Sequence, residues 1–330
     1  ASMFIPELIE KKKKQVPWYE FELVEKFQVN TVNAKFPFPE NYIIKNTDVI
    51  YDPETKAERN IRYLEGVGTI WVDEQEVEYL TPIYSCLKAQ KEWQADFDIQ
   101  PSLDALDTFV EEARIAADNF VTFDESLNGI IDLFFGDWAF SGTNQSIAES
   151  KLNSVSYALA YRTGSSFAMA VILDYVLNEN EFFSEIVVEY GELMVHVRCS
   201  EMEGYFIDPV SGHQSWYIKT ENGTEEDNSD HFQVIPPEDL VKLFIGHQKW
   251  AFISEKRYID ALKCVEMLME MIGDDPYERR DRGYLLKQLD CHNIARDDFE
   301  FFINECPDDP ASELIQHQLD EMDYQHHTFH

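Results

Sequence analysis

The stretch of sequence that decides the fold is EYGELMVHVRCSEMEGYFIDPVSG, residues 189–212. Apolar residues alternate along both halves and polar residues lie between them, which predicts two β-strands joined by a tight turn. A turn centred on Met202 would bring His196 of the first strand opposite Asp208 of the second. Residues that face each other in this way have Cβ atoms about 5 Å apart. The sequence therefore predicts a His196–Asp208 pair.

A carboxylate beside an imidazole can serve catalysis. It fixes the imidazole's tautomer and stabilises its charged form, as the orienting acid does for the base of a nucleophilic triad. Such a pair on a hairpin can equally be a structural contact with no chemistry. Catalysis would therefore require a nucleophile close to His196.

A candidate nucleophile lies in the predicted upstream helix TGSSFAMAVILDYVLN, residues 163–178. This stretch is apolar on almost all sides, so we expect it at the centre of its domain. Gly164, Ser165 and Ser166 stand at its N-terminus, where the helix dipole and free N–H groups stabilise an anion. The order of helix, strand with histidine, hairpin and strand with Asp-Pro resembles the papain-like transglutaminase core. That core opens its helix with Gly-x-Cys, so Ser166 occupies the cysteine position.

Ser166 has two interpretations at this point. As a nucleophile it needs His196 within hydrogen-bond reach, because a helix dipole alone does not ionise a serine hydroxyl. As a helix cap, either Ser165 or Ser166 needs no chemistry, since serine is a preferred N-cap residue. A third possibility is that Cys86 arrives from the N-terminal region as a displaced nucleophile.

The composition sets limits on partners and cofactors. The chain has 330 residues, 44% of them hydrophobic, and a net charge of −36. A strongly acidic surface argues against nucleic-acid binding and can attract basic partners. No apolar run is long enough for a membrane span. Five scattered cysteines without a CxxC pair argue for reduced thiols in a cytoplasm, so neither a metal nor another cofactor is expected.

Four regions are predicted along the chain. Residues 1–14 are expected to form a flexible tail, and residues 15–94 an extension of mixed or β character. Residues 95–240 are assigned to the transglutaminase-like domain and residues 241–330 to tetratricopeptide-like helices. The acidic stretch ENGTEEDNSD, residues 221–230, has no core-forming residue and is expected to be mobile.

The C-terminal region carries an internal repeat. Asp274-Asp275-Pro276 recurs 34 residues later as Asp308-Asp309-Pro310. This is the period of tetratricopeptide helix pairs, and Gly283, Ala295 and Phe299 stand at the small and aromatic positions such a unit needs. One or two units are too few to fold alone, so we expect them to pack on the preceding domain.

Five stretches together resemble the SirB family of bacterial proteins. They are DFDIQPSLDAL (96–106), LNSVSYALAYRTGSSFAMAVILDYVL (152–177), GELMVHVR (191–198), GYFIDPVSG (204–212) and DDPYERRDRGYLLKQLDC (274–291). The resemblance implies a bacterial cytoplasmic protein with an α+β, papain-like transglutaminase-type core followed by tetratricopeptide hairpins. Members generally lack the transglutaminase cysteine, as this chain does at Ser166, whereas His196 and Asp208 carry over residue by residue.

We therefore expect a catalytically degenerate transglutaminase-like protein that acts as a protein- or peptide-binding or regulatory module. The alternative is a serine-dependent hydrolase or acyltransferase in which Ser166 attacks, His196 is the base and Asp208 orients it. The first hypothesis implies a protein or peptide partner and neither nucleic acid nor membrane. The sequence leaves the identity of the partner and the oligomeric state open.

Overall fold

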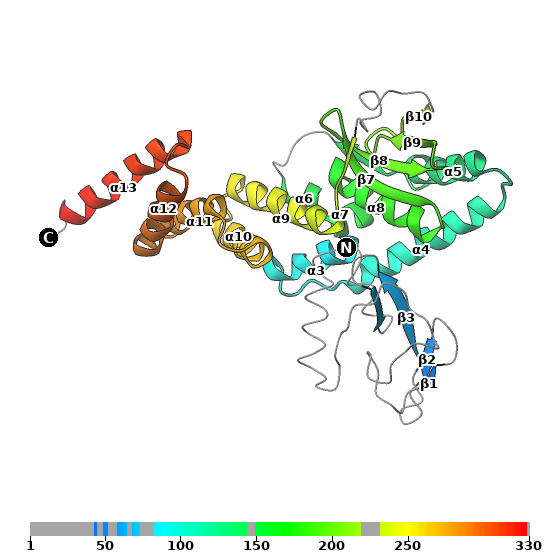
Figure 1. The fold of residues 1–330 in the computed structure, drawn as a ribbon, viewed down its shortest axis with the longest axis horizontal. Coiled ribbons are helices and arrows are strands. Elements are labelled where there is room, and N and C mark those ends of the chain that lie inside the picture. Colours follow the sequence, from blue (N-terminus) through cyan, green and yellow to red (C-terminus); the bar gives the residue numbers. More distant parts are fainter. Residues whose placement is uncertain are drawn as a thin grey trace. The chain divides into compact units, whose positions relative to one another are not determined.

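The computed structural model describes residues 82–143, 149–218 and 232–328, together with four short strands nearer the N-terminus (Figure 1). These strands form one antiparallel sheet in chain order: β1 (Ile43–Ile44), β2 (Val49–Tyr51), β3 (Glu58–Leu64) and β4 (Gly68–Val72). The expected tail, residues 1–14, and the expected acidic loop, residues 221–230, lie outside the described residues.

The chain divides into two compact units. One comprises Ala1–Ser85 with Val234–Val241, and the other comprises Cys86–Gln233 with Lys242–His330. The second unit holds both the transglutaminase-like domain and most of the C-terminal helices.

A five-stranded sheet and a set of helices build the first part of this unit. The sheet has the order β10-β9-β8-β7-β11, and β5 and β6 form a separate parallel pair. The elements in chain order are α3 (Pro82–Trp93), α4 (Gln100–Asp118), α5 (Phe123–Asp132), a π-helical turn (Leu133–Asp137), β5 (Ser141–Thr143), α6 (Ser150–Asn153), α7 (Val155–Tyr161), β6 (Thr163–Ser165), α8 (Ser166–Glu179), β7 (Phe183–Glu189), β8 (Glu192–Arg198), β9 (Glu203–Ile207), β10 (Gln214–Ile218) and β11 (Phe232–Val234).

Helix α8 is the centre of this domain, as its sequence predicts. Every residue from 167 to 173 is at most 2% exposed, because the helix is apolar on all sides and is covered on all sides. Ser165 is its N-cap, and the Ser165 hydroxyl accepts a hydrogen bond from the Ala168 N–H at 3.2 Å. The cap interpretation of this serine pair therefore applies to Ser165, and Ser166 is the first helical residue.

Helices α5 and α8 cover the same face of the sheet. The Ser184 hydroxyl of β7 donates to Asp174 of α8 at 2.6 Å, and the Tyr205 hydroxyl of β9 donates to Asp124 of α5 at 3.0 Å. Successive side chains of a strand point to opposite faces. The strand register then assigns to this helix-covered face four residues that are at most 2% exposed: Ile186, Val195, Val197 and Ile207.

Five helices follow along the chain: α9 (Pro237–Ser254), α10 (Tyr258–Ile272), α11 (Pro276–Gln288), α12 (His292–Glu305) and α13 (Pro310–Thr328). Each copy of the repeated Asp-Asp-Pro begins a helix. Asp275 accepts hydrogen bonds from the Tyr277 and Glu278 N–H groups at α11, and Asp309 accepts one from the Ala311 N–H at α13. The predicted α+β fold followed by helical hairpins is confirmed. No helix in the described part of the chain is long and apolar enough to cross a membrane.

The charged motif of residues 274–291 holds the repeat helices together. Lys249 of α9 is buried, and its ammonium group donates to Glu278 at 2.9 Å and to Asp281 at 2.7 Å. The fully buried Asp298 of α12 receives two hydrogen bonds from Arg282 at 2.7 Å. A buried charge persists only when it is paired, so these contacts fix α11 against both α9 and α12.

Helix α9 is also fastened to the transglutaminase-like domain. The N–H and hydroxyl of Ser150 in α6 donate to the two carboxylate oxygens of Glu255, at 2.7 and 2.9 Å. The Gln248 side-chain amide donates to the Ser150 carbonyl oxygen at 3.0 Å. The repeat helices therefore pack on the domain that precedes them.

The packing of the repeat helices can be tested by a substitution at Gly283. A Cβ atom at Gly283 would lie 2.8 Å from two ring carbons of Phe299 on α12, so the two helices approach closely at the small position that the repeat assigns to Gly283. We predict that Gly283→Leu lowers the free energy of unfolding by roughly 1–3 kcal/mol through overpacking, measured by denaturant unfolding. Gly246→Leu is the control, since a Cβ at Gly246 of α9 meets nothing within 4 Å. An equal loss in both variants would contradict the close-packing argument.

Asp174 makes the stability depend on pH. Burial raises the pKa of Asp174 from 3.8 to about 6, although the Ser184 hydroxyl partly offsets this effect. The folded state therefore favours the protonated acid, and stability is lost as the pH rises from about 4 through 6.

The substitution Asp174→Asn imitates the protonated acid. We predict that its stability advantage over the parent protein grows between about pH 4 and pH 6.5 and levels off on the order of 2 kcal/mol, measured by thermal or urea unfolding. Asp290→Asn, at a side chain that is 94% exposed, should give a difference that does not vary with pH in this way. A constant difference for Asp174→Asn would disprove the linkage.

Candidate functional site

The predicted opposition of His196 and Asp208 is wrong. Strands β8 and β9 pair with His196 opposite Phe206, so Asp208 lies two residues further on, beyond the end of β9. The two side chains are therefore not a cross-strand pair.

The turn between the strands explains the difference. The N–H groups of Cys199 and Ser200 both donate to the Glu203 carbonyl oxygen, at 3.0 and 3.1 Å. These bonds close the loop one residue earlier than a turn centred on Met202 would. Moving the centre of a turn by one residue moves every cross-strand partner by two.

His196 has two other partners. Its Nδ1 lies 2.9 Å from a carboxylate oxygen of Glu185 on β7, and its Nε2 lies 2.8 Å from the Tyr217 hydroxyl on β10. A carboxylate only accepts, so the neutral imidazole carries its proton on Nδ1 and accepts at Nε2 from the tyrosine. The ring also packs against Phe206 and Phe232 and is 1% exposed. Both ring nitrogens are thus already engaged within the sheet.

Ser166 and His196 lie on opposite sides of the sheet. Ser184 points to α8, so its neighbour Glu185 and the paired His196 point to the other face. Ser166 begins α8, on the helix-covered face. The structure therefore does not bring the candidate nucleophile to the candidate base.

Asp208 builds the turn from β9 to β10. Its carboxylate accepts hydrogen bonds from the Val210 N–H at 2.8 Å and the Ser211 hydroxyl at 2.6 Å. Its carbonyl oxygen accepts from the Gly212 N–H at 2.8 Å, and Gly212 has φ +75°, a value that favours glycine. These are the contacts of a residue that shapes a loop.

Cys86, the remaining nucleophile considered from the sequence, is buried within α3. Burial raises the pKa of the Cys86 thiol, which works against formation of a thiolate. No group of three or more His, Cys, Asp or Glu side chains in the described part of the chain is placed to hold a metal ion.

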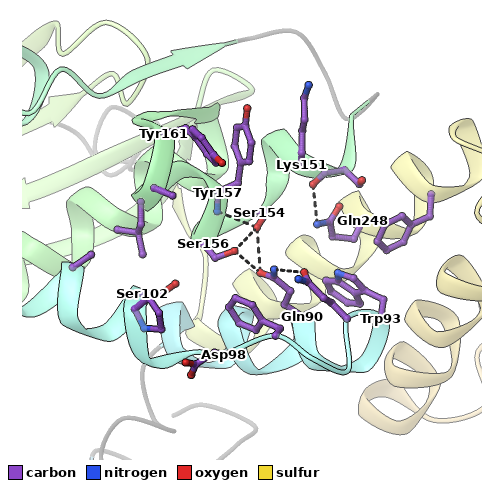
Figure 2. A pocket seen from close by; sticks show the side chains of 18 of the residues that line it. Gln90, Trp93, Asp98, Ser102, Lys151, Ser154, Ser156, Tyr157, Tyr161 and Gln248 are labelled. Atoms are coloured by element: carbon purple, nitrogen blue, oxygen red, sulfur yellow. Dashed lines mark hydrogen bonds between the residues drawn. The ribbon is translucent and has the colours of Figure 1, made fainter.

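A different feature has the geometry of a binding site. A cavity of about 510 Å³ opens between α3, α4, α6, α7 and α9, and Figure 2 shows its labelled side chains coming from these helices and from the turns beside them. This volume lies in the usual range for small-ligand pockets, about 300–1,000 Å³. Its walls are rich in aromatic and aliphatic side chains, among them Trp93, Phe97, Tyr157, Leu159, Tyr161 and Phe252.

A network of hydrogen bonds fixes the polar part of the wall (Figure 2). The buried Gln90 side-chain oxygen accepts from the hydroxyls of Ser154 and Ser156, at 3.2 and 2.8 Å. The Gln90 amide nitrogen donates to the Gln94 side-chain oxygen at 3.0 Å. Ser154 is in turn the N-cap of α7. These side chains are held in place before any ligand arrives.

Gln248 brings an unsatisfied acceptor to this pocket. The residue is 1% exposed, and its amide nitrogen is used by the Ser150 carbonyl oxygen. Its side-chain oxygen is buried and accepts no hydrogen bond from the described residues. A buried acceptor without a donor costs about 1–3 kcal/mol, so this atom has something to gain from a ligand.

Both cations that line the pocket already have anionic partners. Lys151 lies 3.1 Å from Glu149, and Arg257 lies 2.9 Å from Asp260 and 3.4 Å from Glu255. The electrostatic effect of these cations on the cavity is therefore largely neutralised.

Asp98 adds a carboxylate that has no cationic partner in the described part of the chain. One of its oxygens accepts from the Gln100 N–H at 3.0 Å, at the start of α4. Of the three charged side chains that line the pocket, Asp98 is thus the one without an oppositely charged partner among the described residues.

Sequence reasoning missed this pocket entirely. Its residues come from three segments, roughly 90–105, 150–161 and 248–257, with no motif linking them. The closest thing to a signal is the serine-rich stretch around Ser150, Ser154 and Ser156, which reads equally well as a set of helix caps.

Comparison with known proteins now places the chain. A model of the transglutaminase-like superfamily matches residues 100–235, and a tetratricopeptide-repeat model matches residues 248–320. No solved structure matches the chain significantly. The chain thus holds a transglutaminase-like domain followed by tetratricopeptide helices.

Its relatives are bacterial proteins. The chain is 27% identical over 248 residues to the UPF0162 protein YchA of Escherichia coli K12, which covers 71% of this chain and 90% of that protein. It is 25% identical over 242 residues to the protein SirB1 of Salmonella typhimurium, with the same coverage of 71% and 90%. A UPF0162 protein of Vibrio cholerae is 27% identical over 199 residues, or 58% of this chain and 74% of that one. The resemblance to the SirB family is confirmed.

The partners of His196 can be tested directly in solution. We predict that Glu185→Gln changes the imidazole ¹⁵N chemical shifts of His196, because it removes the carboxylate at Nδ1. Asp208→Asn should leave these shifts unchanged, because Asp208 is bonded to its own turn. The His196 signals are assigned by their loss in His196→Gln. The opposite pattern would restore the His196–Asp208 pair.

Proposed function

We propose that this protein is a catalytically degenerate transglutaminase-like protein that binds a protein or peptide partner in the cytoplasm. The observation that carries the proposal is the placement of Ser166 and His196 on opposite faces of one sheet. A nucleophile and its base must lie within hydrogen-bond reach for covalent catalysis. A sheet between them is a barrier that a side-chain rotation does not remove.

The local roles of the three candidate residues favour the same proposal. Ser166 follows directly after the N-cap Ser165, His196 is held at both ring nitrogens, and Asp208 organises a turn. Each residue type is thus explained by folding alone. The serine-dependent hydrolase or acyltransferase remains the rival hypothesis, and it requires a rearrangement of the sheet.

The C-terminal helices support the binding part of the proposal. Tetratricopeptide units stack helix pairs into surfaces that receive peptides or other proteins. In this chain the buried ion pairs of Lys249 and Asp298 fix those helices as a rigid support. The five cysteines are free thiols, which fits a reducing compartment such as the cytoplasm.

Labelling with a serine-reactive fluorophosphonate separates the two hypotheses. We predict that the full chain shows no more label than Ser166→Ala, because Ser166 has no base to remove its proton. Intact-protein mass spectrometry measures the covalent adduct, and a known serine hydrolase in the same reaction controls for the activity of the reagent.

The contrary result is equally clear. An adduct on the wild-type chain that is absent in Ser166→Ala and reduced in His196→Ala would establish the enzyme and remove the binding-module proposal.

A further inference from the structure

We propose that the pocket between α3, α4, α6, α7 and α9 binds a basic side chain, arginine or lysine, of a protein partner. The inference rests on the proposed binding function and names the chemistry of the ligand. Residues of the transglutaminase-like domain and of the first repeat helix line the pocket together. A partner held there would contact both parts of the protein.

The aromatic walls suit a cation on a long apolar stem. Trp93 is held edge-on against Phe252 with ring centroids 5.4 Å apart, and Tyr157 packs on Tyr161 at 4.5 Å. A guanidinium or ammonium group is attracted to an aromatic face within about 6 Å. The methylene groups of arginine or lysine would cover the remaining apolar wall.

Two acceptors of the pocket can take further partners, although Asp98 is exposed and already accepts from the Gln100 N–H. The Gln248 oxygen is buried without a partner, and Asp98 has a carboxylate without a cationic partner, within the residues that the structure describes. An arginine side chain has five N–H donors and a lysine three, with no acceptor on either. A basic side chain therefore supplies what both acceptors need.

An anionic ligand fits these observations less well. It would have to compete with Glu149 for Lys151 and with Glu255 and Asp260 for Arg257. It would also approach the carboxylate of Asp98, and the Gln248 oxygen would still lack a donor. A neutral, wholly apolar ligand would supply neither a donor for the Gln248 oxygen nor a cation for Asp98.

The charge of the whole chain acts in the same direction. A net charge of −36 creates a negative potential that raises the local concentration of basic partners and speeds their association. The effect falls with salt. The pocket would then discriminate a basic side chain among the partners that this field attracts.

The test uses the full chain and short capped peptides. The probes are Ac-Ala-Ala-Xaa-Ala-Ala-NH₂ with arginine, with citrulline (the neutral isostere of arginine) or with glutamate, and inorganic phosphate as a separate anion. The indole ¹⁵N–H signal of Trp93, assigned by its loss in Trp93→Phe, reports occupation of the pocket. A single side chain is expected to bind with millimolar affinity, so titrations extend to about 10 mM.

We expect the arginine peptide to shift the Trp93 signal in a saturable way, with citrulline binding at least about fivefold more weakly. Asp98→Asn should weaken arginine binding by about threefold to tenfold, and it keeps a side-chain oxygen that can accept from the Gln100 N–H. The matched control Asp290→Asn removes the same charge at a side chain that is 94% exposed and does not line the pocket, and it should change affinity less than twofold.

Three results would overturn the assignment: equal binding of the arginine and citrulline peptides, tighter binding of the glutamate peptide or phosphate, and an unmoved Trp93 signal at the highest concentration. These results are independent of the outcome of the fluorophosphonate experiment. A failed peptide titration with an unlabelled Ser166 would therefore remove the ligand assignment alone, whereas a labelled Ser166 would remove the proposed function.

Discussion

The packing of one predominantly apolar helix against one face of a sheet is the constraint on which this structure depends. Residues 167–173 of helix α8 have no polar side chain to turn toward water, so this part of the helix must be covered all round. Strands β7 and β8 supply one of its walls, and alternation along each strand decides which side chains meet the helix. On β8 this selects Val195 and Val197 and sends His196 to the other face. The packing of α8 against the face that carries Val195 and Val197 therefore separates His196 from the start of α8.

The other face of the sheet has to accommodate that histidine. A buried imidazole needs partners for both nitrogens, and Glu185 and Tyr217 provide them from the neighbouring strand β7 and the edge strand β10. Phe206 and Phe232 exclude water around the ring. Such a satisfied network specifies the order of the strands well, since each partner comes from a different strand. His196 therefore has a structural role, in which it links neighbouring strands of the sheet.

Local signals in the sequence were sufficient where the structure is itself local. The apolar run that makes α8, the two Asp-Asp-Pro helix starts and the close approach at Gly283 all depend on residues within a helix or its immediate neighbour. The register of the hairpin could not be obtained in this way. It depends on whether the Glu203 carbonyl oxygen closes the turn, and a difference of one residue there moves a partner by two positions.

The pocket and the role of Lys249 escaped prediction for a related reason. Lys249 stands 34 residues before Gly283, so it occupies a position where the repeat has a small residue. Its presence there is explained only by its ion pairs with Glu278 and Asp281, which are 29 and 32 residues away. The pocket combines side chains from three distant segments. Contacts of this kind leave no periodic pattern in the sequence, because any residue whose charge or shape fits the folded structure can occupy such a position.

Helix α9 connects these two unpredicted features. Its neighbouring residues Gln248 and Lys249 make unlike contacts: Gln248 bonds to the Ser150 backbone beside the pocket, and Lys249 bonds to carboxylates of α11. The ion pairs of Lys249 resist movement of α9 strongly, because breaking them would leave charges buried and unpaired. The wall of the pocket is therefore held by the packing of the repeat. By the reciprocity of linked equilibria, a ligand that prefers this position of α9 must also stabilise the packing of the repeat helices.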